Sequence, residues 1–321
     1  MPLRERLAIG VDVGGSKVAA GVVDPDGRVL DRTGRATPGS DATEVEDTIA
    51  DVVRELGSRH PVVAVGIGAA GFVETTGSTV LFAPHLAWRN EPLRDAVQRR
   101  TGMPVVVEND ANAAAWAEHR FGAAQGVDDL VCITLGTGIG GAMMFGGRLH
   151  RGSYGLAGEF GHHQVMPGGH QCECGNRGCW EQYASGRALV RAARELASSG
   201  SSTAFGVPVD RLTGPMVSEA ARGGDRTARE LITEIGDWLG VGIAGIAAAL
   251  DPGLFVVGGG VSEAGELLLG PTRDAFRRTL TGRGFRPEAR IVKAYLGNEA
   301  GLVGAADLAR SGAGASRPTG T

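Results

Sequence analysis

The feature that most constrains the fold is a strand–turn–strand pattern that occurs twice. Residues 7–23 read LAIGVDVGGSKVAAGVV, and residues 130–145 read LVCITLGTGIGGAMMF. Each copy has an apolar strand, a glycine-rich turn and a second apolar strand, and a third strand follows the first copy at residues 29–35. The copies lie about one domain's length apart. We interpret them as an internal duplication of the start of a fold.

The rest of the chain alternates between strand and helix patterns. Further strands are expected at residues 62–71, 105–110, 254–259 and 289–294, with helices at 43–57, 93–101, 111–120, 185–198, 216–223, 228–250, from 263 and at 299–310. This alternation predicts an α/β protein with two similar halves. We expect a smaller N-terminal domain of residues 1–115 plus 300–310, a larger domain of residues 116–299, and a flexible tail at 311–321.

Charge and apolar patterning exclude several classes of protein. The 321 residues suffice for two domains, and a net charge of -4 argues against a general nucleic-acid binder. We find no export signal, and apolar runs such as residues 243–250 are too short to span a bilayer. We therefore expect a cytoplasmic protein without membrane or nucleic-acid partners, whose four cysteines do not form disulfides.

Three glycine turns follow apolar strands: DVGGSK at 12–17, LGTGIGG at 135–141 and VGGGVS at 257–262. Glycine lets backbone N–H groups converge on a phosphate. The first turn is not a P-loop, because Ser16 precedes Lys17. The second matches G-x-G-x-x-G, but a hairpin rather than a helix follows it, which argues against a dinucleotide site. Each turn alone is equally compatible with a plain hairpin.

Taken together, the three turns fit an actin-like nucleotide-binding fold, which needs a phosphate hairpin from each half and a third turn against the nucleoside. Asp12 would then hold Mg²⁺ through water, and Ser16 and Lys17 would meet phosphate oxygens. Lys17 is equally compatible with a solvated strand end. The predicted nucleotide-binding residues are Asp12, Gly14, Gly15, Ser16, Lys17, Gly136, Thr137, Gly138, Gly258, Gly259 and Gly260.

A cysteine-rich segment, GHHQVMPGGHQCECGNRGCWEQ at residues 161–182, contains Cys172, Cys174 and Cys179. Three thiolates and one imidazole make a closed tetrahedral zinc site with a structural role. The spacing differs from zinc-finger patterns, so nucleic-acid binding does not follow. By proximity, three histidines compete for the fourth position: His162, His163 and His170. Cys132 lies in an apolar strand and is expected in the core.

Asn109 and Asp110 end the strand VVVEND and open an alanine-rich helix. Either residue fits the ordinary role of a helix cap.

These motifs resemble those of the ROK family of repressors and sugar kinases, and within it the glucokinases. The resemblance runs from IGVDVGGSK at residues 9–17 to LGNEAGLVGAADLA at 296–309, and the cysteine segment is its most specific part. It implies two actin-like (RNase H-like) domains with a nucleotide and sugar cleft between them. It also implies phosphorylation of the glucose 6-hydroxyl by ATP, a structural zinc, Mg²⁺ with ATP, and a homodimer or homotetramer.

The resemblance assigns roles to individual residues. Asp110 becomes the general base, and His162 is selected as the zinc ligand beside Cys172, Cys174 and Cys179. The residues expected to hold the sugar are Gly71, Asn109, Asp110, Glu159, His162 and Glu181. Without the resemblance, Glu159 and Glu181 would be interpreted as solvated loop carboxylates.

Three positions depart from the family pattern: Ser16 stands where Thr is usual, His85 where many members have Asn, and Ala142 where Gly is common. Other ROK kinases for fructose, N-acetylmannosamine or allose, and a polyphosphate-using glucokinase, are the nearest alternatives. A non-catalytic sugar-sensing regulator and a zinc-dependent interaction module are alternatives of a different class.

Overall fold

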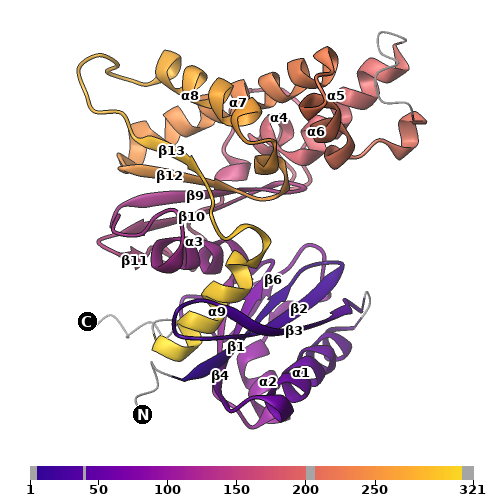
Figure 1. Cartoon of the computed structure of the whole chain (residues 1–321), viewed down its shortest axis with the longest axis vertical. Helices are drawn as coiled ribbons and strands as arrows, with labels where there is room; N and C mark the ends of the chain where they lie inside the picture. The colour runs from indigo at the N-terminus through magenta and orange to yellow at the C-terminus, as the bar shows by residue number, and fades with distance from the viewer. Residues whose placement is uncertain (1–5, 39–40, 200–206, 313–321) are drawn as a thin grey trace. The chain divides into compact units, whose positions relative to one another are not determined.

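A computed structural model describes residues 6–38, 41–199 and 207–312 of the chain (Figure 1). The predicted tail falls outside the described residues from 313 onwards.

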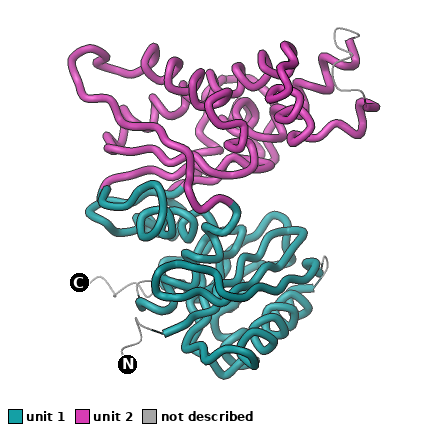
Figure 2. The backbone as a smooth tube through the Cα atoms, in the orientation of Figure 1, with its two compact units in different colours: residues 1–128, 142–157, 298–321 teal, residues 129–141, 158–297 magenta. Residues whose placement is uncertain are grey.

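The chain forms two compact units (Figure 2). Unit 1 comprises Met1–Asp128, Ala142–Ala157 and Asn298–Thr321, and unit 2 comprises Asp129–Gly141 and Gly158–Gly297. Residues 116–128 and 142–157 thus group with unit 1, although we expected them in the larger domain. The chain crosses between the units at residues 128/129, 141/142, 157/158 and 297/298.

Unit 1 is built on a five-stranded sheet in the order β3-β2-β1-β4-β8. Antiparallel pairs join β1 to β2 and β2 to β3, whereas β4 pairs in parallel with β1 and β8. The strands are β1 (Leu7–Val13), β2 (Lys17–Val23), β3 (Val29–Ala36), β4 (Val62–Ala69) and β8 (Val105–Asn109). The helices are α1 (Ala42–Arg59), α2 (Leu93–Thr101), α3 (Asp110–Phe121) and α9 (Ala300–Ser311).

Alternate residues of a strand point to opposite faces of the sheet. Different helices cover the two faces here. Ile9 and Val11 are buried in one apolar cluster with Ile49 of α1. Gly10 and Gly66, on β1 and β4, instead lie against the backbone of α9. A Cβ added at Gly66 would lie 1.8 Å from the carbonyl oxygen of Ala305, so only glycine permits this close approach.

Unit 1 also has a small sheet that the sequence patterns do not predict. It pairs β5 (Phe72–Val73), β6 (Val80–Phe82) and β7 (Arg89–Glu91). Strands of two or three residues are too short to show a recognisable alternation.

The second sheet repeats the order of the first, as β11-β10-β9-β12-β13. Its strands are β9 (Leu130–Leu135), β10 (Ile139–Phe145), β11 (Arg148–Leu149), β12 (Leu254–Gly258) and β13 (Arg290–Lys293), and the division between the units falls within β10. β12 pairs in parallel with both β9 and β13. A hairpin followed by parallel strands therefore occurs in both sheets, as the duplicated sequence pattern predicts.

The helices of unit 2 are α4 (Glu181–Ala184), α5 (Gly186–Ser198), α6 (Gly214–Arg222), α7 (Arg226–Leu250) and α8 (Glu266–Thr279). Short 3₁₀ helices include η2 (Phe160–His162) and η4 (Gly260–Ala264). By length and composition, α7 alone among the described helices could cross a membrane, but 61% of its most apolar stretch is buried inside the protein. It is the central helix of unit 2 and packs on α8.

Candidate active site and metal centre

The first glycine turn joins β1 to β2 in unit 1. The N–H of Gly14 donates to the carbonyl of Lys17 over 3.0 Å. Thr37 braces the turn from beyond β3: its hydroxyl donates to Gly14 O at 2.7 Å, and its N–H donates to Ser16 O at 3.1 Å. Gly15, Ser16 and Lys17 are exposed. The turn therefore presents a fixed backbone and a cation to solvent, which suits a phosphate.

Asp12 is the penultimate residue of β1 and lies beside the first turn of α9. A Cβ added at Gly301 would lie 3.6 Å from Asp12 Cγ, which places the carboxyl at the helix N-terminus. Burial raises the pKa of Asp12, and the nearby Lys17 charge opposes that rise. A half-buried carboxyl beside a phosphate turn is a suitable partner for a hydrated Mg²⁺ ion.

His85 lies against the same turn, which its sequence position did not reveal. A Cβ added at Gly15 would be only 2.7 Å from His85 Cβ. The segment that carries His85 therefore packs directly on the turn, and Gly15 is required there for space.

Of the two residues that the sequence offered as a helix cap, the structure places Asn109 at the cap. Asn109 caps α3, because its Oδ1 accepts from Asn112 N–H at 3.0 Å. Its Nδ2 donates to the carbonyl of Gly71 at 3.0 Å, so two predicted sugar-binding positions are in contact. Asp110 is the first residue of α3 and accepts from Ala111 N–H at 2.9 Å. Its carboxylate thus lies at the N-terminus of α3.

The glycine turns of unit 2 border an apolar cavity of about 380 Å³. Gly136, Thr137 and Gly260 line it, as the predicted nucleotide site requires. Gly259 adopts φ +83° in the third turn, where a Cβ would be 2.5 Å from Leu135 O. The remaining wall includes residues of α5 and α6 that no motif indicated: Gly186, Arg187, Leu189, Val190, Gly214, Pro215 and Ser218. Its size and apolar walls suit a nucleobase.

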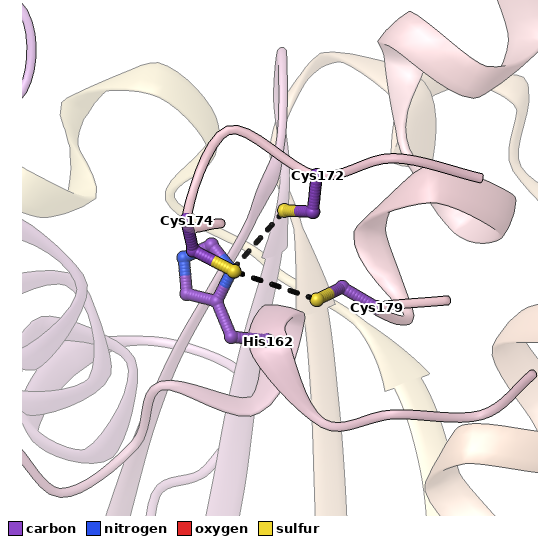
Figure 3. Close-up of side chains that lie close together, drawn as sticks. All are labelled: His162, Cys172, Cys174 and Cys179. Carbon is purple, nitrogen blue, oxygen red and sulfur yellow. Dashed lines mark hydrogen bonds between the residues drawn. The ribbon is translucent and has the colours of Figure 1, made fainter. Parts of the chain in front are cut away.

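Figure 3 shows His162, Cys172, Cys174 and Cys179 grouped together in unit 2. Their ligand atoms all lie within 4.8 Å of one another. His162 Nδ1 is 3.6 Å from Cys172 Sγ, and the Sγ atoms of Cys174 and Cys179 are also 3.6 Å apart. These separations resemble the edges of a tetrahedron with bonds of about 2.3 Å to zinc, and they exclude a disulfide, which needs about 2.05 Å.

The chemistry of this ligand set fits zinc, because three soft thiolates and one imidazole leave no open position. His170 instead stacks on Tyr183, with 5.3 Å between the ring centres. Burial raises the pKa of the Cys172 thiol to about 12, a backbone hydrogen bond at Cys174 lowers it, and a hydrogen bond to Glu181 adds to the rise. A metal must therefore displace a tightly held proton here.

The two predicted sugar carboxylates of unit 2 flank His162. Its Nδ1 lies 3.8 Å from Glu181 Oε1, while its Nε2 lies 3.9 Å from Glu159 Oε2. Burial raises the pKa of Glu159, with the charge of His162 opposing and that of Glu181 adding to the rise. Glu181 also touches the second glycine turn, since a Cβ at Gly138 would be 2.3 Å from Glu181 Oε2. The histidine–cysteine cluster, Glu159, Glu181 and the second glycine turn are therefore neighbours.

Comparisons with known proteins show the family to which the chain belongs. The ROK family profile matches residues 8–311. A glucokinase from Streptomyces coelicolor is 50% identical over 95% of this chain and 98% of its own length. A glucokinase from Halalkalibacterium halodurans is 36% identical over 94% of each chain.

Among solved structures, a ROK family glucokinase from Streptomyces griseus in complex with glucose and AMPPNP superposes with a TM-score of 0.88. It is 54% identical, and the match covers 95% of this chain and 99% of that one. The match to the family profile across almost the whole chain shows that this chain belongs to the ROK family.

Proposed function

We propose that this protein is an ATP-dependent glucokinase that phosphorylates the 6-hydroxyl of glucose. The observation that carries the proposal is the similarity, over 95% of the chain, to the Streptomyces griseus glucokinase that binds glucose and AMPPNP. The residues described above fit the activity. The carboxylates and the amide can accept hydrogen bonds from sugar hydroxyls. The glycine turns suit phosphates, and the apolar cavity suits the nucleobase of ATP.

In the proposed reaction, the 6-hydroxyl oxygen of glucose attacks the γ-phosphorus of MgATP. The new O–P bond forms as the bond to the bridging oxygen of ADP breaks, and the hydroxyl proton passes to the carboxylate of Asp110. Because the transition state of phosphoryl transfer is loose, Asp110 acts chiefly by orienting the hydroxyl for in-line attack.

Zinc is assigned to His162, Cys172, Cys174 and Cys179, with a structural role. Nδ1 of His162 would be the ligand nitrogen, since that atom faces Cys172. Its Nε2, on the side of Glu159, would then be left to donate to a sugar hydroxyl. A homodimer or homotetramer is the assembly that we propose, on the family resemblance alone.

An ADP-release assay across a sugar panel tests the proposal. Glucose, fructose, N-acetylmannosamine and allose would each be supplied with MgATP or with polyphosphate. We expect the highest kcat/KM for glucose with MgATP. No turnover with any hexose would overturn the kinase assignment, and faster turnover with another sugar or with polyphosphate would replace its substrate.

The Asp110→Asn variant tests the assigned base. It should lose at least about 100-fold in kcat while still binding glucose, because an amide keeps the shape but cannot accept the proton. Glucose binding is measured by calorimetry. A variant that keeps most of its turnover would show that Asp110 is not the base and serves only the N-terminus of α3.

A further inference from the structure

A buried ion pair joins the strand that carries the predicted base to a distant segment of unit 1. Glu108 is the penultimate residue of β8, directly before Asn109, and its side chain is 4% exposed. Arg151 lies 43 residues further along the chain, just after β11. Its Nε and Nη2 atoms both donate to Glu108 Oε2, over 2.8 and 2.5 Å. A bond of this kind fixes direction as well as charge.

The other oxygen of Glu108 holds the start of α3. Oε1 accepts from the backbone N–H of Asn109 at 3.1 Å and from Asn112 Nδ2 at 2.9 Å. Asn109 and Asn112 lie on either side of Asp110 in sequence, and they also bond to each other through the helix cap. One buried carboxylate therefore fixes the strand–helix junction on both sides of Asp110.

Asn112 shows that this junction is not arranged for stability alone. Its side chain is buried, and its Oδ1 has no hydrogen-bond partner among the described residues. An unpaired buried acceptor costs about 1–3 kcal/mol. Turning the Asn112 amide over would place its Oδ1 against Glu108 Oε1, and two acceptors would then face each other. The Glu108 carboxylate therefore fixes the orientation of the amide, and Oδ1 is left unpaired. Exceptions of this kind call for a functional explanation.

The position of Arg151 is itself set by the fold of unit 1. Its carbonyl accepts from Ala157 N–H at 3.1 Å, which closes the segment 151–157 into a loop. Gly155 in this loop has φ +82°, and a Cβ there would lie 2.1 Å from the carbonyl oxygen of Val73. The loop is therefore seated against β5, and the chain continues from Ala157 through Gly158 into Glu159.

We propose that Arg151 is a positioning residue for phosphoryl transfer, which acts through Glu108 to hold Asp110 in line with the sugar 6-hydroxyl. Arg151 needs no contact with substrate for this role. The rate of an in-line transfer is sensitive to small displacements of the group that orients the nucleophile. The inference rests on the glucokinase activity proposed above.

The test compares Arg151→Met and Arg151→Lys with the wild-type protein. Arg151→Met should lower kcat by about 10- to 100-fold, with the KM for MgATP unchanged. Arg151→Lys keeps the charge but loses the planar guanidinium, so its kcat should lie between those of the wild-type protein and Arg151→Met. The lysine variant also provides a result if the methionine variant does not fold.

Arg310→Met is the matched control. Arg310 pairs with Asp307 in unit 1, and both side chains are 2% exposed. Its loss should lower the melting temperature at least as much as Arg151→Met, with no change in kcat for the folded protein. A wild-type kcat in Arg151→Met, or an equal fall of kcat in Arg310→Met, would overturn the role of Arg151. A wild-type protein that releases no ADP with glucose would instead refute the proposed function.

Discussion

At the scale of single residues, Glu46 on α1 is a buried acid whose charge works against the fold. Its side chain is 7% exposed, and its Oε2 lies 2.8 Å from Arg100 Nη1. Burial raises its pKa to about 7, a hydrogen bond and the charge of Glu91 add to the rise, and Arg100 opposes it. Folding therefore favours the protonated form.

The sign of the pH dependence follows from this raised pKa. The folded protein holds the Glu46 proton more tightly than the unfolded chain, whose value is near 4.5. This contribution to stability is complete below about pH 4.5 and is lost as the pH rises through about 7. Glu46→Gln stays neutral, so its melting temperature should fall less than that of wild type between about pH 5 and pH 8. Parallel melting curves for the two proteins would contradict this assignment.

At the scale of elements, the cysteine segment carries the proposed zinc site together with a proposed sugar contact. Cys174→Ser should lose zinc, measured as metal content per chain, and should unfold at lower temperature. Because zinc orients His162, the KM for glucose should also rise by about tenfold. Cys132→Ala is the control: Cys132 lies in β9 outside the cluster, so its variant should keep its zinc. A folded, zinc-free protein with the wild-type KM would separate the metal from the sugar site.

The packing of α9 on the first sheet gives a second prediction for an element. Gly66→Ala would bring a methyl group into the backbone of α9, where Ala305 O is 1.8 Å from the Cβ position. We expect a loss of about 1–3 kcal/mol in the free energy of unfolding. Gly57→Ala is matched in chemistry but lies at an exposed position of α1, where a Cβ would be in ordinary contact with Val62 at 3.8 Å, so it should stabilise by about 0.4–1 kcal/mol. Urea unfolding of both variants measures the difference.

At the scale of the whole molecule, the duplicated strand–turn–strand pattern and the alternation of strands and helices predicted two similar α/β halves. The repeated order of the two sheets follows from it, because each hairpin is extended by parallel strands. The cysteine–histidine cluster was also predictable in residue type, since three cysteines lie within eight residues. The family resemblance then distinguished His162 from its neighbours.

Contacts that depend on tertiary structure could not be predicted in this way. Thr37 braces the first glycine turn from beyond a whole strand, and Arg151 meets Glu108 across 43 residues. Leu189 and Val190 line the cavity of unit 2 from a helix whose apolar face looks like an ordinary core face. No local pattern marks such residues, because their partners are set by how the elements pack.

The two units also predict how the protein responds to zinc removal. The sheet that contains β1 and β4 lies entirely in unit 1, whereas the four proposed metal ligands all belong to unit 2. Local unfolding proceeds in cooperative units rather than evenly through a chain. After chelation, amide hydrogen exchange should therefore accelerate first in residues 160–181, while β1 and β4 of unit 1 keep their protection. Cys132→Ala should respond to the chelator as wild type does. Equal acceleration in β1 and in the cysteine segment would show instead that the metal stabilises the whole molecule as one cooperative unit.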